Sequence, residues 1–264
     1  MQFLYRLLSE LWCGTGEINK MKKELIILIL SVLTYNVYAG EIYKNMPGLV
    51  ELWHFNGSSY AVAEINPAHA ANMGAGCSFT TGKYGKSGLF TFNPCAGATF
   101  NDTGLPTGNN PRSLSFWYYG NSTTANYERL FAYGAWNTNN SAFVIYFSAG
   151  DNTLVFDSYG SGNTYIFTKN PPTKFYHKWT HLTFVLYSSG QYMNLFINGK
   201  LNRLLTFTKS INTALDKDRS AIGGAGGQTN AGANGVIDDI AVWNISLSTA
   251  QVYNIYSQTR KKYQ

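Results

Sequence analysis

The sequence has few charged residues. Asp, Glu, Lys and Arg make up 13% of its 264 residues, compared with about 25% in average proteins, and this scarcity excludes charge-rich disorder and coiled coils. The formal net charge is +6, but the basic residues are spread thinly, apart from a short basic tail at 260–262. Nucleic-acid binding requires clustered cations, so we expect no nucleic-acid partner. What the chain does have is 45% hydrophobic residues, 16% aromatic residues and 26 glycines, which favours β structure around a buried core.

Long hydrophobic runs are also missing, apart from one near the start of the chain. Met21 is followed by two lysines, by the apolar run 25–33, and by small residues that end at Ala39. These are the three parts of a secretory signal peptide. We therefore expect residues 1–39 to be an upstream extension plus a signal peptide that starts at Met21 and is cleaved after Ala39, which leaves one domain, 40–264. The alternatives are an unusually long n-region and a retained N-terminal membrane anchor, and only such an anchor would bring the protein to a membrane.

Cysteine is scarce too. Of the three cysteines, Cys13 would be lost with the leader, which leaves Cys77 and Cys95. An even pair in an exported chain favours a disulfide over two buried free thiols, and such a bridge would contribute about 3 kcal/mol. Neither cysteine has a partner at Cys-x-x-Cys spacing, so a zinc site is not expected. We expect the protein to be secreted or to lie at the cell surface.

Short β-rich runs separated by turn signals follow the leader. The runs are 49–55, 113–119, 143–147, 154–159, 179–187, 192–197 and 236–243. In the first run, Leu49, Trp53 and Phe55 are predicted to share one face. One helix is signalled at the end, because Ser248 and Gln251 form a capping box for a helix over 249–257. Strands followed by a single short helix indicate an all-β sandwich and exclude an alternating β-α-β topology.

Several stretches carry a more specific signal when they are taken in order. They are 48–57 (GLVELWHFNG), 82–92 (GKYGKSGLFTF), 114–117 (LSFW), 179–184 (WTHLTF), 195–200 (LFINGK), 222–224 (IGG) and 235–244 (GVIDDIAVWN). Together they resemble the laminin-G-like branch of the concanavalin A-like lectin/glucanase superfamily across about 48–257. This resemblance implies a jelly-roll β-sandwich of two antiparallel sheets with a short C-terminal helix.

Catalytic residue sets are absent from the sequence. The glucanases of that superfamily carry a Glu-x-Asp-x-Glu strand motif, and retaining hydrolysis needs two carboxyl groups about 5–5.5 Å apart. The predicted mature chain has isolated glutamates only, namely Glu41, Glu51, Glu64 and Glu128. Asp216 and Asp218 have a strand-like spacing, but they lie in a polar segment that favours a solvated turn. His181 is predicted to be a hydrogen-bonded structural histidine rather than a ligand. We therefore expect no enzyme activity.

The resemblance also implies a possible structural calcium ion. The carboxylate of the last strand would be its side-chain ligand, here Asp238, with backbone carbonyls near Asn56 and Gly88 completing the site. Hard calcium ions take carboxylate and carbonyl oxygens, as this set would offer. The departure from the family is that Asn56 stands where an acidic residue is common. The alternative is that Asp238 faces solvent while Asp239 bonds to a neighbouring loop.

Binding is the function that these observations leave. Aromatic faces and planar polar side chains hold sugars, because C–H edges stack while hydroxyls need donors and acceptors. Trp136 is the best candidate for such a role, with Tyr133, Asn137 and Tyr159 as possible companions, although a packing role for Trp136 is an equal alternative. We expect a non-catalytic lectin-like module that recognises a glycan or an extracellular protein. The alternatives are an adhesive or coat subunit and a divergent glycan hydrolase.

Overall fold

The computed structural model describes most of the chain from residue 42 onward. The described ranges are 42–56, 59–82, 85–91, 93–121, 127–136, 138–148, 153–160, 164–168, 175–216, 218–226 and 232–263. The sheets belong to one compact unit, Tyr43–Gln264. The predicted extension and signal peptide lie outside the described residues. None of the helices in the described ranges is long and apolar enough to cross a membrane.

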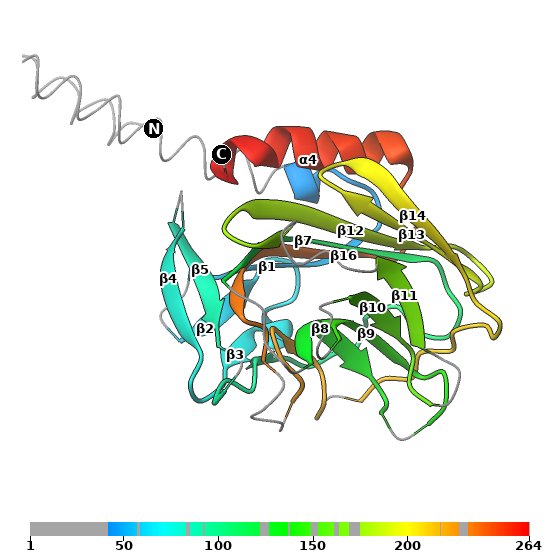
Figure 1. Cartoon of the computed structure of the whole chain (residues 1–264), viewed down its shortest axis with the longest axis horizontal. Helices are drawn as coiled ribbons and strands as arrows, with labels where there is room; N and C mark the ends of the chain where they lie inside the picture. Colours follow the sequence, from blue (N-terminus) through cyan, green and yellow to red (C-terminus); the bar gives the residue numbers. More distant parts are fainter. Residues whose placement is uncertain are drawn as a thin grey trace, which may run out of the picture. The chain divides into compact units, whose positions relative to one another are not determined.

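The chain folds into two layers of antiparallel strands (Figure 1). Sheet A contains, in spatial order, β14 (Lys200–Thr206), β13 (Tyr192–Ile197), β12 (Trp179–Leu186), β7 (Arg112–Gly120), β16 (Gly235–Trp243) and β1 (Leu49–His54). The hairpin of β4 (Ser78–Gly82) and β5 (Gly85–Phe90) pairs with β16. Sheet B contains β3 (Ala71–Met73), β6 (Ala98–Thr99), β15 (Ala221–Ile222), β8 (Glu128–Gly134), β9 (Ala142–Phe147), β10 (Leu154–Asp157) and β11 (Thr164–Thr168). This arrangement is the expected jelly-roll β-sandwich.

One strand connects the two layers. β2 (Tyr60–Ala63) pairs with β1 of sheet A through its second half and with β3 of sheet B through its first half. A short 3-10 helix, η1 (Pro67–His69), follows it and is capped by the side chain of Asn66. Because β2 belongs to both ladders, it closes one side of the sandwich.

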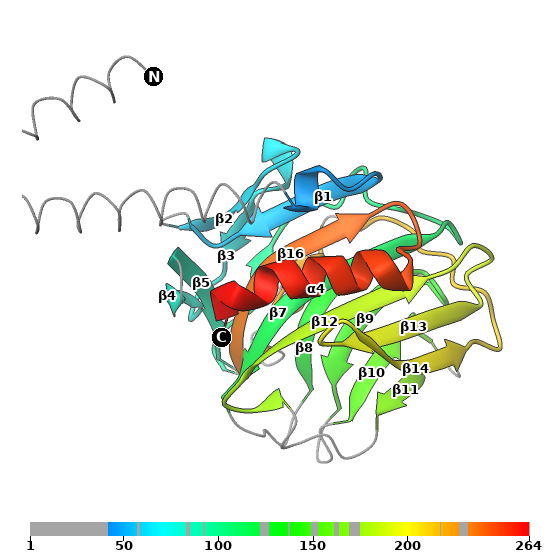
Figure 2. The ribbon, with the colours of Figure 1, turned by 90° about the horizontal axis from the view of Figure 1, so that it is seen from above.

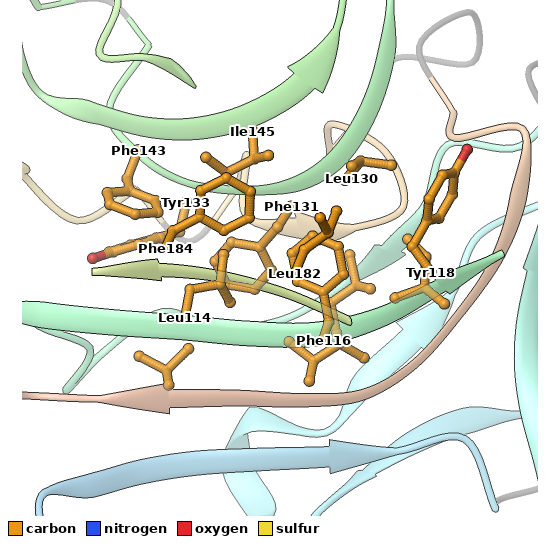
Figure 3. Packing of buried hydrophobic residues seen from close by; sticks show 14 of the residues in the cluster. Leu114, Phe116, Tyr118, Leu130, Phe131, Tyr133, Phe143, Ile145, Leu182 and Phe184 are labelled. Atoms are coloured by element: carbon orange, nitrogen blue, oxygen red, sulfur yellow. The ribbon is translucent and has the colours of Figure 1, made fainter. Parts of the chain in front are cut away.

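The main core lies between the two sheets. On β7, alternate residues Leu114, Phe116 and Tyr118 point into it, as period-two spacing requires. Figure 3 shows these side chains facing residues of sheet B, among them Phe131 and Ile145. The dense packing of aromatic and aliphatic side chains fixes which faces of β8 and β9 are left to point outward.

A C-terminal helix covers the outer face of sheet A. α4 (Thr249–Tyr263) begins with the predicted capping box: the side-chain oxygen of Gln251 accepts from Ser248 N–H at 2.8 Å, and Ser248 Oγ accepts from Gln251 N–H at 3.3 Å. Val252 and Ile255 are fully buried in a second hydrophobic cluster on this face. Figure 2 shows the helix lying across sheet A. It runs to Tyr263, beyond the predicted end at 257.

Two local predictions have different outcomes. Cys77 and Cys95 form the expected disulfide, with their Cα atoms 4.8 Å apart. The predicted common face of β1 is wrong in part. Trp53 and Phe55 face the main core, but Leu49 packs against the cluster under α4. The reason is an irregularity in the pairing of β1 with β16 between residues 49 and 51, which shifts Leu49 to the other face.

Candidate functional site

A pocket lies on the face of sheet B that points away from the core, and we call it the sheet B pocket. Its volume is about 260 Å³. The residues that line it are Tyr127, Arg129, Trp136, Val144, Tyr146, Asp157 and Thr164. They come from β8, β9, β10, β11 and the segments flanking β8. The pocket therefore depends on several adjacent strands of one sheet.

Strand register brings these residues together. Arg129 of β8 is paired with Tyr146 of β9, and Val144 of β9 is paired with Asp157 of β10. The pairing shifts by one residue between Arg129 and Phe131, so Leu130 is the extra residue of a β-bulge. On β9, alternation sends its phenylalanines inward and leaves Val144 and Tyr146 outward.

Arg129 is held against an aromatic ring. Its guanidinium carbon lies 4.9 Å from the ring centroid of Trp136, within the range of a cation–π interaction. Burial lowers the pKa of Arg129, while the nearby Tyr146 and Asp157 act in the opposite direction. Trp136 in turn packs against the apolar residues of this face, including Val144. The arginine thus lies against the Trp136 ring at the pocket wall.

Asp157 brings the opposite charge to the same pocket. Its Oδ1 accepts a hydrogen bond from the backbone N–H of Tyr159 at 2.6 Å. Burial raises the pKa of this carboxyl. The hydrogen bonds from Tyr159 and Thr164 and the positive charge of Arg129 lower it, but less than burial raises it. The pocket therefore combines one guanidinium with one partly desolvated carboxylate.

Two tyrosines complete the aromatic part of the pocket. The rings of Tyr127 and Tyr146 meet edge to face, with centroids 5.6 Å apart and planes at 73°. Tyr127 is 52% exposed, so its ring is accessible at the rim, whereas Tyr146 is buried. Burial raises the pKa of Tyr146, and the neighbouring Asp157 adds to this effect. The hydroxyl of Tyr146 is therefore a neutral donor at physiological pH.

Of the four residues predicted from the sequence as ligand-binding candidates, the structure describes three, and these three do not all line the pocket. Trp136 is half-buried and lines the pocket. Tyr133 does not reach it: its side chain is 1% exposed and its hydroxyl lies 2.7 Å from a guanidinium nitrogen of Arg112 in the core. Figure 3 shows Tyr133 among the core side chains. Tyr159 is exposed and is not among the described lining residues, although its backbone N–H donates to Asp157. Asn137 lies outside the described residues.

The acidic pair of β16 lies in a separate buried cluster. His54, Asp238 and Asp239 each place a potential ligand atom within 4.8 Å of the others. His54 Nδ1 is 2.7 Å from Asp239 Oδ1, and Asp238 Oδ2 accepts from the hydroxyl of Ser87 at 2.9 Å. Asp238 is 1% exposed, so the solvent-facing alternative for it is wrong.

The predicted calcium ligands fit this cluster only in part. The carboxylate oxygens of Asp238 and Asp239 are of the type that calcium prefers, whereas the imidazole of His54 is not. The side-chain oxygen of Asn56 accepts from the backbone N–H of Lys86 at 3.3 Å. Gly88 lies inside the ladder of β4, β5 and β16. A calcium ion here would be held by the two aspartates, whose like charges it would neutralise.

Most residues of the sheet B pocket carry no sequence signal that marks them as a site. Arg129, Tyr146 and Asp157 are spread over 29 positions of the chain, and only the register of three strands unites them. One signal was present: the run 142–147 (AFVIYF) is apolar at every position, so both of its faces require cover.

Comparison with known proteins agrees with this fold. A sequence model of the family described as the concanavalin A-like lectin/glucanases superfamily matches residues 95–253. Comparison with curated proteins finds no match. Among solved structures, domain 4 of AbnA, an extracellular arabinanase from Geobacillus stearothermophilus in complex with arabinotriose, is 20% identical with a TM-score of 0.58, covering 79% of this chain and 98% of that one.

Two toxin domains are also similar in fold. The binding domain of Paraclostridial Mosquitocidal Protein 1 is 14% identical with a TM-score of 0.59, covering 79% of this chain and 52% of that one. The ligand-binding domain of botulinum neurotoxin serotype D, in complex with N-acetylneuraminic acid, is 17% identical with a TM-score of 0.56, covering 80% and 50%. This chain therefore spans about half the length of the two toxin domains. At these identities the likeness concerns the fold.

Proposed function

Because the chain belongs to the concanavalin A-like lectin/glucanases superfamily, we propose that it is an exported, non-catalytic module that binds carbohydrate in the sheet B pocket. The observation that carries this proposal is the lining of the pocket, where three aromatic rings surround one guanidinium and one carboxylate. Sugar rings place C–H edges against aromatic side chains, while their hydroxyls both donate and accept hydrogen bonds. Tyr127 supplies the accessible ring, and Arg129 and Asp157 supply the donors and the acceptor.

The carboxylates near the pocket favour binding over hydrolysis. Asp157 is the one carboxylate among the pocket's described lining residues. Glycoside hydrolysis in most families needs an acid and a second carboxylate on either side of the bond. Glu128 is close in sequence, but its side chain is buried. The site therefore offers recognition groups without the pair that cleavage requires.

Export is supported by two independent features. The Cys77–Cys95 disulfide is typical of proteins that fold in an oxidising compartment. The predicted signal peptide at the start of the chain has the composition of a secretory leader. The similar arabinanase is described as extracellular, which also favours export.

Two of the similar structures contain a bound saccharide, which favours carbohydrate as the ligand class.

Binding of the purified protein to an immobilised glycan array tests the proposal. We expect saturable binding that is lost in Tyr127→Ala, because this substitution removes the accessible ring of the pocket. Tyr253→Ala is the matched control, since Tyr253 is also 52% exposed but lies on α4, over the other sheet. It should bind as the wild-type protein does.

Two results would contradict this function. Glycan binding that is equal in Tyr127→Ala and Tyr253→Ala would place the site elsewhere. Concentration-dependent self-assembly with no glycan signal would instead favour a structural coat or adhesive subunit, and sedimentation velocity would detect it.

A further inference from the structure

The two charges of the sheet B pocket lie on neighbouring strands of one sheet. Arg129 belongs to β8 and Asp157 to β10, with β9 between them, and both line the same cavity. Each acts on the other electrostatically. No other lining residue that the structure describes carries a formal charge at neutral pH. The pocket is therefore close to neutral, although the whole chain carries +6.

From this charge balance we infer that the pocket selects an uncharged sugar unit and rejects sugars that carry a carboxylate. The inference rests on the proposed function and deepens it. A sugar hydroxyl can donate to the carboxylate of Asp157 and a neighbouring hydroxyl can accept from the guanidinium of Arg129, so two adjacent hydroxyls satisfy both charges. Each of these bonds has one ionised partner, which makes it stronger than a bond between neutral groups.

An acidic sugar does not match the two charges of the pocket. Its carboxylate would be attracted by Arg129 but repelled by Asp157 across the same small space. The guanidinium of Arg129 already lies over the Trp136 ring and interacts with the negative charge of Asp157. Its positive charge is therefore partly balanced before any ligand binds. Burial raises the pKa of Asp157, and a second negative charge beside it would disfavour its ionised form further.

The size of the pocket limits the ligand further. Its volume is about 260 Å³, which is below the roughly 300 Å³ at which pockets for drug-sized ligands begin. One sugar ring fits such a space better than several. Tyr127 at the rim is then placed to contact the edge of that ring or the next unit of the glycan.

The test compares pairs of sugars that differ at one position, where one member is neutral and the other carries a carboxylate. The methyl glycosides of galactose and galacturonic acid, and of glucose and glucuronic acid, exchange one hydroxymethyl group for a carboxylate. We expect calorimetric titration at pH 7 to show that the neutral member of whichever pair binds does so at least about tenfold more tightly, because a uronate carboxylate loses hydration in a pocket whose lining has no net positive charge to compensate it. Arabinose serves as a further neutral probe.

Asp157→Asn isolates the cause of the selectivity. It keeps the size of the side chain and removes its charge, so the neutral sugar should bind more weakly while the uronic acid binds more tightly, and the two affinities should converge. Asp218→Asn, at an exposed aspartate that is not among the lining residues, should keep the wild-type ratio. Thermal unfolding of each variant shows whether it is folded.

The outcomes separate the two proposals. A wild-type protein that binds the uronic acid as well as or better than its neutral partner, with binding still lost in Tyr127→Ala, would overturn the selectivity and leave the carbohydrate function standing. A protein that binds no saccharide on the array or in solution would overturn the proposed function and the selectivity with it. The wild-type comparison alone decides the selectivity if Asp157→Asn does not fold.

Discussion

The imidazole of His181 packs beside the indole of Trp117, with ring centroids 5.0 Å apart, on the face of sheet A that α4 covers. The ring of Tyr256 of α4 also lies near it, at 6.1 Å between ring centroids. His181 is fully buried, and this burial lowers its pKa to about 3, with the charge of Asp239 acting weakly in the other direction. The predicted structural role of this histidine agrees with its position, although its bond to Thr183 is long, at 3.4 Å.

This buried imidazole predicts acid sensitivity. Between pH 6.5 and about 3 the unfolded chain binds a proton at His181 that the folded chain does not, so the free energy of unfolding falls as the pH is lowered through this window. The loss amounts to at most about 1.4 kcal/mol per pH unit. His181→Phe should lack this component, as measured by urea unfolding at pH 7, 6, 5 and 4. His177→Asn, at an exposed histidine, should keep the wild-type slope, and equal slopes in all three proteins would contradict the prediction.

The Cys77–Cys95 bridge should contribute a large share of the stability. It closes a loop with a sequence separation of 18, and such a constraint on the unfolded chain is worth about 3 kcal/mol. The double variant Cys77→Ser/Cys95→Ser should lose about this amount in urea unfolding. The wild-type protein in excess dithiothreitol should show the same loss, because both conditions remove the same constraint. A loss below about 1 kcal/mol in both would show that the unfolded chain is already compact here.

The parts of the fold that depend on local signals were predictable from the sequence. The capping box at Ser248 and Gln251 forms as expected, because its two bonds join residues three positions apart. Asn198 and Gly199 both adopt positive φ values, 51° and 73°, in the two-residue turn that joins β13 and β14. Such features require no knowledge of the rest of the molecule.

The sheet B pocket depends on signals of another kind. Arg129 points outward because Leu130 is the extra residue of a bulge, and the sequence has no mark that fixes where a bulge falls. Tyr133 was expected at the site, but it lies on the inward face of the same strand, where Arg112 binds its hydroxyl. A one-residue change of register reverses the face of every residue that follows. Trp136 was predictable as a candidate because it lies just beyond the end of β8.

Calcium should stabilise the protein if Asp238 and Asp239 hold the ion. Two adjacent buried carboxylates repel each other, and a divalent cation between them would remove this cost. At calcium concentrations about ten times Kd the gain in free energy of unfolding is about 1.4 kcal/mol. We expect calcium to raise the Tm of the wild-type protein after EDTA treatment and to leave that of Asp238→Asn unchanged. A larger response to zinc than to calcium would indicate that His54 is a ligand, and a response to neither ion would contradict a metal site.

Asp102 should be essential for the shape of the loop that carries Trp136. It is 1% exposed, and its Oδ2 accepts from the N–H of Gly134 at 3.3 Å, the N–H of Asp216 at 2.9 Å and the hydroxyl of Ser220 at 2.8 Å. One carboxylate oxygen thus ties the end of β8 to the segment before β15.

Asp102→Asn keeps the volume of this side chain but removes its charge and places an amide where one oxygen stood. Hydrogen bonds to charged groups contribute about 1.5–3 kcal/mol each, so we expect the free energy of unfolding to fall by about 2–4 kcal/mol, on the scale of a broken buried polar network. Asp218→Asn, at an exposed aspartate two residues after Asp216, should change it by less than about 0.5 kcal/mol. Because Gly134 precedes Trp136 by two residues, glycan binding should weaken in Asp102→Asn even at temperatures where the variant is fully folded. Unchanged affinity in a destabilised Asp102→Asn protein would show that Trp136 is positioned by its packing on Val144 and Arg129 alone.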